Sequence, residues 1–511
     1  MRVNNILLYG FLFFLAFGLR IYPLTVSHPF WVDEFSTAVQ AKIYATTFPD
    51  TFSQTKYDIE PNNYLYHTIV AIFFRIFMEA EWAARLPAAM AGALVCVVVY
   101  IYAKKLFNTP TAGIAFALTT FSYFHLTWST QARGYTLQQL LLLVSHVLIF
   151  HLQQSRNNKE RLVTSVGIGL CIVLGLLTHT TFVIGAFSII IYLAFSYKDL
   201  LLKKKKLIVP LLGIFLLGLL LWLPQIVKVW QAGFLSLNNN LWYYHALLWR
   251  EETIIVFLAV VALLKLALNR KPMVYLPLLT LGAYLILFTF IFQPYTSRYV
   301  MSYFPFLLLL AAYGIYSIGL HLSKHAVIPA WALTVFILVN GHTFEVFPQR
   351  YFSVNHTMRD IALVDYDQIY QRVTNSIETS NEPVVMIDTW RDRAWWYLGI
   401  DYPHLYIFRW DTSTQTINGL LASSDYYEEN GRKYMKGTGN PPIQLIVTKE
   451  DLLTIIAEHP KGYIWIDDTS LPADVIEYVE QNMKKELFVD HYTYDDNAYS
   501  LWPGTLYSWG M

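Results

Sequence analysis

Long apolar runs dominate the first two thirds of the chain. About eleven of them approach the roughly 20 residues that a helix needs to cross about 30 Å of hydrocarbon. They fall near residues 6–22, 86–102, 111–128, 135–152, 163–177, 182–195, 207–226, 254–268, 274–292, 301–320 and 327–344. The sequence therefore predicts a polytopic α-helical membrane protein with about eleven transmembrane helices.

One further apolar run, residues 64–78, is shorter and carries His67 and Arg75. Counting it as a span would invert the orientation of every later loop. We therefore expect a helix that lies in the membrane interface or packs re-entrantly, as short apolar stretches with polar positions often do.

Basic residues fall on alternate loops between the predicted spans. They are Arg2, Lys104, Lys105, Arg156, Lys159, Arg161, Lys198, Lys203, Lys204, Lys205, Lys206, Arg270, Lys271 and Lys324. Because short loops rich in Lys and Arg stay in the cytoplasm, these loops are predicted to be cytoplasmic. The intervening loops 23–85, 129–134, 227–252 and 293–299, and the tail from about residue 347, are then predicted to face outward across the cell membrane.

The composition changes after residue 346, where polar and apolar residues mix and no further spanning run occurs. Strand-like runs at 383–388, 444–447 and 463–466 alternate with helical patterns such as 474–485, and a weaker strand pattern lies near 499–502. The sequence thus predicts two domains: a transmembrane domain over 1–346, whose outward loop 23–85 holds candidate acids, and an extracytoplasmic α/β domain over 347–511.

Composition supports the membrane assignment and argues against nucleic-acid binding. Of 511 residues, 55% are hydrophobic and only 14% are charged, with a mean hydropathy of +0.38. The formal net charge of +1 provides no concentrated basic surface for phosphate backbones. Two cysteines, Cys96 and Cys171, both lie in apolar runs and cannot build a disulfide framework.

Asp33 and Glu34 form an acidic pair in an aromatic stretch just after the first predicted span. Carboxylates beside a membrane are costly to desolvate, so we expect the pair to bind a cation, form ion pairs or act on a proton. Alternatively, both are solvated loop acids, or one caps a helix that begins near Phe35.

Other polar and aromatic residues gather at the same outward face. They are Asp58, Glu60, Tyr64, Tyr66, His67, Arg85, His125, Gln131, Arg133, Tyr135, Arg298 and Tyr299. An arginine at a span end either binds phosphate through its two-pronged guanidinium or extends to lipid headgroups. The aromatic residues alternatively form the interfacial belt that is common in membrane proteins.

Several short motifs occur in a fixed order along the first 320 residues. They are Asp33-Glu34, Glu60-Pro61-Asn62 with Tyr64-Leu65-Tyr66, Arg85-Leu86-Pro87-Ala88-Ala89, Gln131-Ala132-Arg133-Gly134-Tyr135, and Ser297-Arg298-Tyr299 with Pro305. This ordered set resembles the membrane glycosyltransferases of the GT-C superfamily, near the protein O-mannosyltransferase and lipid A aminoarabinose transferase group. The chain departs from that pattern at Asn62-Asn63, where many relatives have two prolines, and at Ala132, where relatives often have an acid.

The resemblance implies a GT-C fold and an inverting transfer of a hexose or pentose. The donor would be a polyprenyl-phosphate-linked sugar, and the acceptor a protein, lipid or glycan at the outer face of the membrane. Asp33 would act as general base on the acceptor hydroxyl, and Glu34 would position Asp33 or the acceptor.

The resemblance also implies roles for the other outward residues. Arg85, and after it Arg133 or Arg298, would stabilise the phosphate of the donor as it leaves. Substrate contacts would come from Asp58, Glu60, Tyr64, Tyr66, His67, His125, Gln131, Tyr135 and Tyr299.

No His or Cys spacing marks a zinc site, and we expect neither a metal nor another cofactor. Two other functions stay open at this point: a lipid or glycan transporter, and a non-catalytic membrane scaffold. A transporter should place ionisable residues near the bilayer midplane, whereas here they gather at helix ends. The sequence therefore favours an enzyme.

Overall fold

The computed structural model describes most of the chain. The described residues are 3–25, 30, 32–47, 63–155, 157–196, 220, 223, 227, 235–269, 274–293, 295–323, 325–340, 344, 365–408, 426–436, 438, 442–467, 471–489 and 504–511. The chain divides into two compact units. The helical unit comprises Met1–Val26, Pro61–Ile69 and Trp82–Ser353, and the mixed unit comprises Ser27–Glu60, Val70–Glu81 and Val354–Met511.

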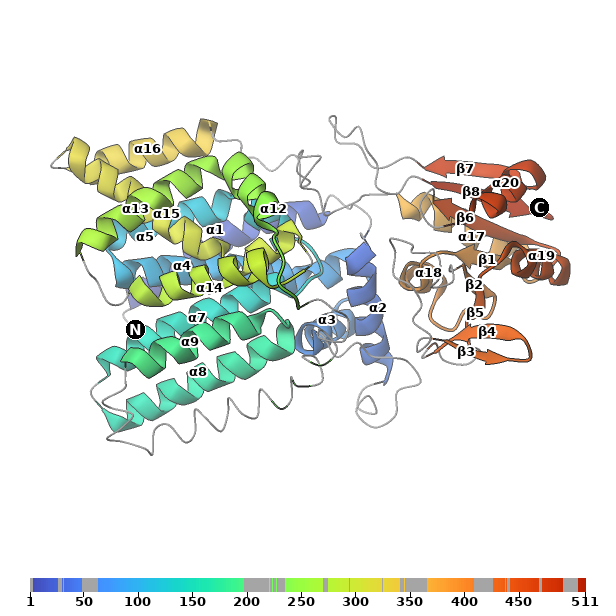
Figure 1. The fold of residues 1–511 in the computed structure, drawn as a ribbon, viewed down its shortest axis with the longest axis horizontal. Helices are drawn as coiled ribbons and strands as arrows, with labels where there is room; N and C mark the ends of the chain where they lie inside the picture. Colours follow the sequence, from blue (N-terminus) through green and yellow to red (C-terminus); the bar gives the residue numbers. More distant parts are fainter. Residues whose placement is uncertain are drawn as a thin grey trace. The chain divides into compact units, whose positions relative to one another are not determined.

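The helical unit is built from helices that follow the apolar runs (Figure 1). They are α1 (Val3–Thr25), α3 (Tyr64–Ile76, whose later part belongs to the mixed unit), α4 (Glu81–Leu106), α5 (Thr109–Phe121), α6 (Tyr123–Ser129), α7 (Tyr135–Gln154), α8 (Asn158–Thr178), α9 (Phe182–Ser196), α12 (Leu241–Ala246), α13 (Thr253–Asn269), α14 (Tyr275–Phe290), α15 (Phe304–Leu322) and α16 (Val327–Asn340). A π-helical turn, η2 (Leu247–Glu251), and a 3₁₀ turn, η4 (Ser297–Ser302), complete the unit.

Among the described residues, four helices have the length and apolar composition to cross a membrane: α4, α7, α8 and α15. The apolar α3 is only 13 residues long, as expected for the run at 64–78. The helical character is therefore confirmed, while the count of eleven spans stays a prediction. The predicted span 207–226 lies outside the described residues except at positions 220 and 223.

Two predicted spans differ in detail from the structure. The run at 111–128 is not one helix, because the chain breaks at Ser122 between α5 and α6. The Ser122 hydroxyl accepts a hydrogen bond from the His125 backbone N–H at 3.2 Å and so caps a new helix. The run at 301–320 begins as the 3₁₀ turn η4, and α15 starts only at Phe304, with Pro305 in its first turn.

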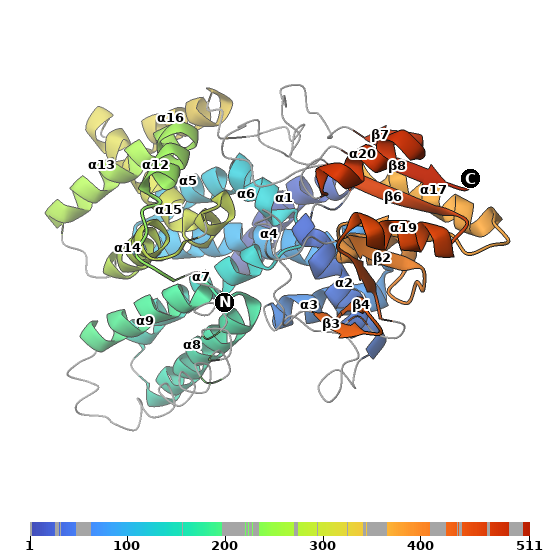
Figure 2. The same ribbon diagram turned by 45° about the vertical axis from the view of Figure 1, so that its right-hand side comes forward.

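Close approach of helices relies on small residues. Helices α7, α8 and α9 lie side by side in both ribbon views (Figures 1 and 2).

The clearest case of such an approach is the pair α13 and α15, where a Cβ at Gly314 would collide with the backbone carbonyl of Leu258. Gly314 therefore lets the two backbones meet, which is how helices pack where no water drives them together.

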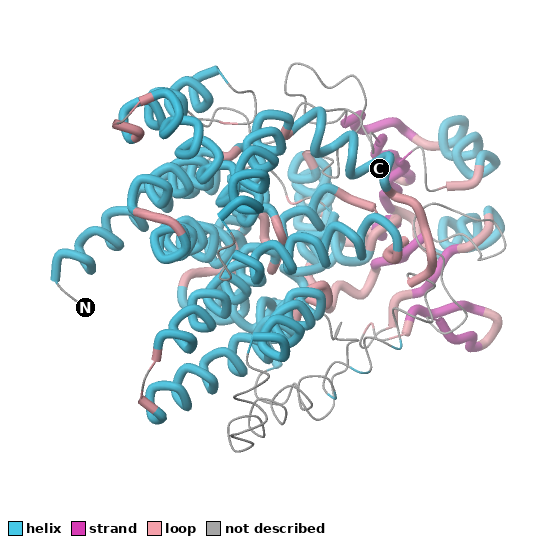
Figure 3. The backbone as a smooth tube through the Cα atoms, turned by 60° about the vertical axis from the view of Figure 1, so that its left-hand side comes forward, coloured by secondary structure: helices cyan, strands magenta, loops and turns pink. Residues whose placement is uncertain are grey.

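The mixed unit contains an eight-stranded sheet within the described residues, coloured magenta in Figure 3. Its order is β3 (Tyr426–Glu429), β4 (Arg432–Met435), β5 (Gln444–Ile446), β2 (Leu405–Phe408), β1 (Val385–Asp388), β6 (Gly462–Asp467), β8 (Gly504–Trp509) and β7 (Lys484–Val489). The four central strands β5, β2, β1 and β6 are parallel, and the outer strands are antiparallel. The C-terminal α/β character predicted from the sequence is therefore confirmed.

Helices α17 (Tyr366–Thr379), α18 (Arg391–Leu398), α19 (Lys449–Glu458) and α20 (Ala473–Asn482) accompany the sheet. The predicted strands at 383–388, 444–447 and 463–466 correspond to β1, β5 and β6. The predicted helix at 474–485 corresponds to α20 but ends earlier, at Asn482, because Lys484 and Lys485 pair with β8 as part of β7. The weaker strand pattern at 499–502 lies outside the described residues.

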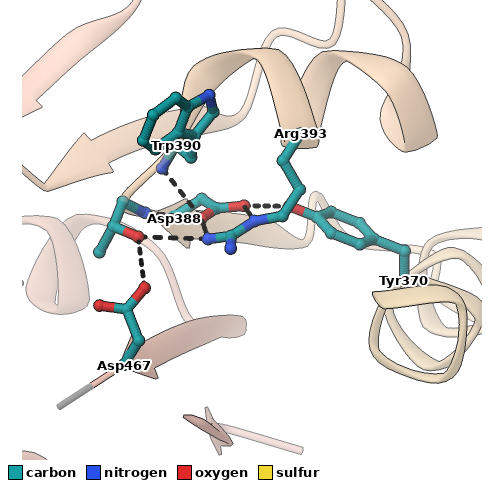
Figure 4. A network of polar contacts seen from close by, with 6 residues as sticks. Tyr370, Asp388, Trp390, Arg393 and Asp467 are labelled. Carbon is teal, nitrogen blue, oxygen red and sulfur yellow. Dashed lines mark hydrogen bonds and ion pairs between the residues drawn. The ribbon is translucent and has the colours of Figure 1, made fainter. Parts of the chain in front are cut away.

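A buried polar network joins the ends of β1 and β6 (Figure 4). Asp388, the last residue of β1, forms an ion pair with Arg393 of α18 and accepts a hydrogen bond from the Tyr370 hydroxyl of α17. The Thr389 hydroxyl donates to Asp467 at 3.2 Å. Because these side chains are buried, the Asp388 carboxylate is compensated by Arg393 and by hydrogen bonds rather than by water.

We expect Arg393→Met to destabilise the mixed unit by about 3–5 kcal/mol, because it leaves the buried Asp388 carboxylate without its cation. In the full-length protein, hydrogen exchange of β1 and β6 amides should then speed up by at least about a hundredfold. The matched control is Arg432→Met, whose partner Glu458 is 37% exposed. That change should cost less than about 1 kcal/mol. Equal effects of the two variants would contradict the buried role of Arg393.

Candidate functional site

The acidic pair lies at the start of α2 (Val32–Thr47), which belongs to the mixed unit. Asp33 and Glu34 occupy the first helical turn, where the partial positive charge of the helix N-terminus favours carboxylates. Asp33 is half-buried and Glu34 is fully buried. An ion pair of Lys42 with Glu79 at 3.0 Å ties α2 to the segment that follows α3.

The predicted phosphate-binding arginines lie in the helical unit, at the ends of its helices. Arg133 is in the turn between α6 and α7, and its guanidinium lies 5.8 Å from the ring centroid of Tyr135. The Tyr135 ring is in turn 5.0 Å from that of His179, which follows α8. Arg298, in η4, lies 6.0 Å from the Tyr299 ring centroid.

Electrostatics connect these residues into one cluster. Burial, followed by the charges of Arg133 and Arg298, lowers the pKa of His179 to about 3. Burial and the charge of Arg133 also lower the pKa of His67, on the short helix α3, to about 3. Both imidazoles are therefore neutral at physiological pH, and the positive charge of this cluster comes from its two arginines.

Hydrogen bonds from side-chain hydroxyls to backbone carbonyls connect the start of α4, which carries Arg85, to α3 and to the start of α7. The Tyr66 hydroxyl donates to the Ala84 carbonyl at 3.4 Å, and the Thr136 hydroxyl donates to the Ala88 carbonyl at 3.0 Å. Gly134 packs against Tyr66 and against Thr178 at the end of α8, at a distance where a Cβ would be crowded. Arg85 itself is only 1% exposed.

Gln131 precedes Arg133 by two residues, in the turn between α6 and α7. The side chain is fully buried, and neither its amide oxygen nor its amide nitrogen has a hydrogen-bond partner among the described residues. Leaving buried polar atoms unpaired costs about 1–3 kcal/mol each. Such atoms call for a further partner, such as a water molecule, an ion or a ligand.

The remaining predicted contact residues have different surroundings. Tyr64 is exposed and opens α3, whereas Tyr299 is half-buried and stacks on Phe288 with ring centroids 5.1 Å apart. Asp58 and Glu60 lie outside the described residues. Within the described residues, no group of three or more His, Cys, Asp or Glu side chains is arranged to hold a metal ion.

His125 belongs to a buried network that the sequence did not predict. Its Nδ1 accepts a hydrogen bond from Arg20 of α1 at 2.8 Å, so its Nε2 carries the proton and donates to the Gln139 oxygen at 3.0 Å. The Gln139 amide then donates to the Met301 carbonyl in η4, the turn that contains Arg298. Since both ring nitrogens are occupied, His125 acts as a structural link. Arg20 inside an apolar run was the sequence signal for this network.

Comparison with known proteins places the fold. A family model described as dolichyl-phosphate-mannose-protein mannosyltransferase matches residues 63–227. This segment contains the motifs around Tyr64, Arg85 and Arg133. No curated protein matches the sequence.

Solved structures match over almost the whole chain. ArnT from Cupriavidus metallidurans in the apo state is 10% identical, with a TM-score of 0.61 over 99% of this chain and 98% of that one. ArnT bound to undecaprenyl phosphate is 11% identical, with a TM-score of 0.52 over the same shares. The oligosaccharyltransferase of Archaeoglobus fulgidus is 12% identical, with a TM-score of 0.57 over 98% of this chain and 76% of that one.

The chain therefore has the fold of the GT-C membrane glycosyltransferases, and the resemblance found in its sequence motifs is confirmed. At these identities the structural likeness concerns the fold. The substrates of this chain have to be argued from its own residues.

We expect Gln139→Leu to lower the thermal stability of the detergent-purified protein. The change leaves the His125 N–H and the Met301 carbonyl unpaired in a buried site, at about 1–3 kcal/mol each. The matched control on the same helix is Gln153→Leu, which removes a single, partly buried hydrogen bond of 2.9 Å to the Tyr192 hydroxyl. Unfolding midpoints that fall equally in both variants would argue against the network.

Proposed function

We propose that this chain is an integral membrane glycosyltransferase that moves a sugar from a polyprenyl-phosphate donor to an acceptor hydroxyl. The observation that carries the proposal is the arrangement at His179: the Arg133 guanidinium lies 5.8 Å from the Tyr135 ring centroid, that ring lies 5.0 Å from the His179 ring, and the charge of Arg298 acts on the same imidazole. Guanidinium groups match the charge and the oxygen geometry of a phosphate. The fold supports the proposal, because an ArnT structure of this fold is bound to undecaprenyl phosphate.

In the proposed reaction the acceptor oxygen attacks the anomeric carbon of the donor. The bond between that carbon and the phosphate oxygen breaks, and its electron pair leaves with the polyprenyl phosphate. Arg85, Arg133 and Arg298 would stabilise the growing negative charge on the phosphate. Because attack occurs opposite to the leaving group, the configuration of the sugar inverts.

Asp33 would accept the proton of the acceptor hydroxyl as the new bond forms. A carboxylate oxygen can accept a proton, and the first turn of α2 holds the Asp33 side chain at a helix N-terminus. Glu34 would orient Asp33 or the acceptor. Contacts to the sugar and acceptor would come from Gln131, Tyr64, Tyr66, Tyr135 and Tyr299, together with Asp58 and Glu60.

The alternation of basic loops supports an outward orientation of the reaction. In this arrangement about eleven helices span the cell membrane, and residues 347–511 form an extracytoplasmic domain. The acceptor, whether protein, lipid or glycan, would then meet the donor at the outer face.

We expect Asp33→Asn to reduce sugar transfer by about a thousandfold, because the amide cannot accept the proton. The measurement is transfer of radiolabelled sugar in purified membranes supplied with a panel of polyprenyl-phosphate sugars and native acceptor extract. Wild type and variant are compared at matched expression. Asp33→Glu, which keeps the base but lengthens its side chain, should retain more activity than Asp33→Asn.

Normal transfer by Asp33→Asn would remove Asp33 from its assigned role. If the wild-type protein transfers no sugar from any donor, the glycosyltransferase proposal fails, and a transporter or a non-catalytic scaffold becomes the favoured function.

We expect Arg133→Gln and Arg298→Gln to raise the KM for the donor by about tenfold to a hundredfold each, since each loses a charge-assisted hydrogen bond to phosphate. The matched control is Arg161→Gln, in the first turn of α8 and so about 27 Å of helix away from His179. Its donor KM should stay at the wild-type value. Donor KM values that do not change in Arg133→Gln or Arg298→Gln would rule out these arginines as phosphate ligands.

A further inference from the structure

Two phenylalanines on either side of the acidic pair pack into the C-terminal part of the chain. Phe30 precedes Asp33, Phe35 follows Glu34, and both rings are only 1% exposed. Their centroids are 5.6 Å apart, with an edge-to-face angle of 87°. The Phe30 ring is 5.0 Å from Trp396 of α18. The Phe35 ring contacts α17 and α18, at 5.7 Å from Tyr366 and 5.8 Å from Tyr397.

The same face of α2 is held again two turns later. Lys42 lies seven residues after Phe35, so the two side chains share one helix face. The Lys42 ammonium is 5.5 Å from the Trp396 ring centroid. Asp33 precedes Phe35 by two residues and so points about 160° away from that face. The contacts therefore fix α2 while leaving the Asp33 carboxylate directed away from them.

The aromatic platform formed by Tyr366, Trp396 and Tyr397 is itself tied to the sheet. The Tyr397 hydroxyl donates to Asp367 at 2.7 Å, and its ring stacks on Tyr370 at 4.5 Å. The Tyr366 ring lies 4.6 Å from the guanidinium carbon of Arg393.

The buried ion pair completes this connection. Arg393 pairs with Asp388, which also accepts the Tyr370 hydrogen bond. Burial and the Asp388 charge raise the pKa of Tyr370 well above its ordinary value, so the hydroxyl keeps its proton and remains a donor. A continuous line of contacts thus runs from the end of β1 to the start of α2.

We propose that the aromatic platform is a positioning element of the active site: it holds α2 so that Asp33 has a fixed place and direction. The inference rests on the proposed role of Asp33 as general base. It assigns a function to the C-terminal domain, which supports the helix that carries the general base Asp33. A shift of the base by about 1 Å can reduce a rate by about a hundredfold, so such support bears directly on catalysis.

The test uses the full-length protein with Phe35→Ala and Trp396→Ala. Both variants should lower kcat by about tenfold to a hundredfold while the donor KM stays within about twofold, because the arginine cluster is unchanged. The conservative variants Phe35→Tyr and Trp396→Phe keep an aromatic ring and should restore most of kcat. A merely structural role would reduce the amount of active enzyme without this pattern of loss and rescue.

Hydrogen exchange gives a second readout that does not depend on activity. Amides of α2 should exchange at least about tenfold faster in Phe35→Ala, while those of β1 and β6 stay as in wild type. The matched control is Tyr427→Ala, which removes a stacked ring of the β3–β4 hairpin, 5.6 Å from Tyr434. It should change neither kcat nor the exchange of α2. If Phe35→Ala also accelerates β1, the milder Phe35→Leu replaces it in both measurements.

The outcomes separate the two proposals. If Asp33→Asn loses transfer but Phe35→Ala, or its substitute Phe35→Leu, keeps the wild-type kcat, the positioning role is wrong and the base assignment stands. If α2 exchange rises without a change in kcat, the positioning role is also wrong. If Asp33→Asn transfers sugar normally, the proposed function fails whatever the platform variants do.

Discussion

The buried ion pair of Asp388 and Arg393 is the interaction on which the mixed unit depends. Removing two charges from water is expensive, and the cost is offset only where further hydrogen bonds satisfy both groups. Tyr370, Thr389 and the backbone of Trp390 supply those bonds. The pair thereby joins β1, α17 and α18 into a single arrangement, and the aromatic side chains that receive α2 come from these two helices. A hydrophobic substitute of the same volume would fill the space but would not fix the direction of each partner.

The helical unit handles its charges in two different ways. Arg20 is fully buried, and its guanidinium donates hydrogen bonds to the Ala16 carbonyl, Cys96 and His125. Arg133 and Arg298 instead lie at helix ends beside neutral imidazoles. The buried Arg20 links α1 to other helices, whereas guanidinium groups at helix ends beside neutral imidazoles give that region a positive potential, which favours an anion. In the proposed function, the same residue type therefore holds helices together at Arg20 and binds the donor at Arg133 and Arg298.

Local patterns predicted most of the elements but few of the connections. Apolar length alone identified α4, α7, α8 and α15, and β-branched runs identified β1 and β6, because both signals reside in consecutive residues. The break at Ser122 escaped, since a side-chain cap interrupts an otherwise uniform apolar run. The motifs pointed to Arg133 and Arg298. The contact of Phe35 with Tyr397 could not be predicted, because nothing in one segment encodes a partner more than 300 residues away.

That separation has a consequence for how the protein matures. Helix α2 leaves the ribosome early, but α18 follows about 350 residues later. At about 5–20 residues per second, roughly 20–70 s pass between the synthesis of α2 and that of α18. During this time α2 has no aromatic side chains of α18 to pack against. A helix of 16 residues is marginal by itself in water, so its order has to wait until α17 and α18 have been synthesised. A chain that ends before α18 therefore contains Asp33 and Glu34 but lacks the aromatic residues that pack against α2. In such a chain the position of the acidic pair is not fixed.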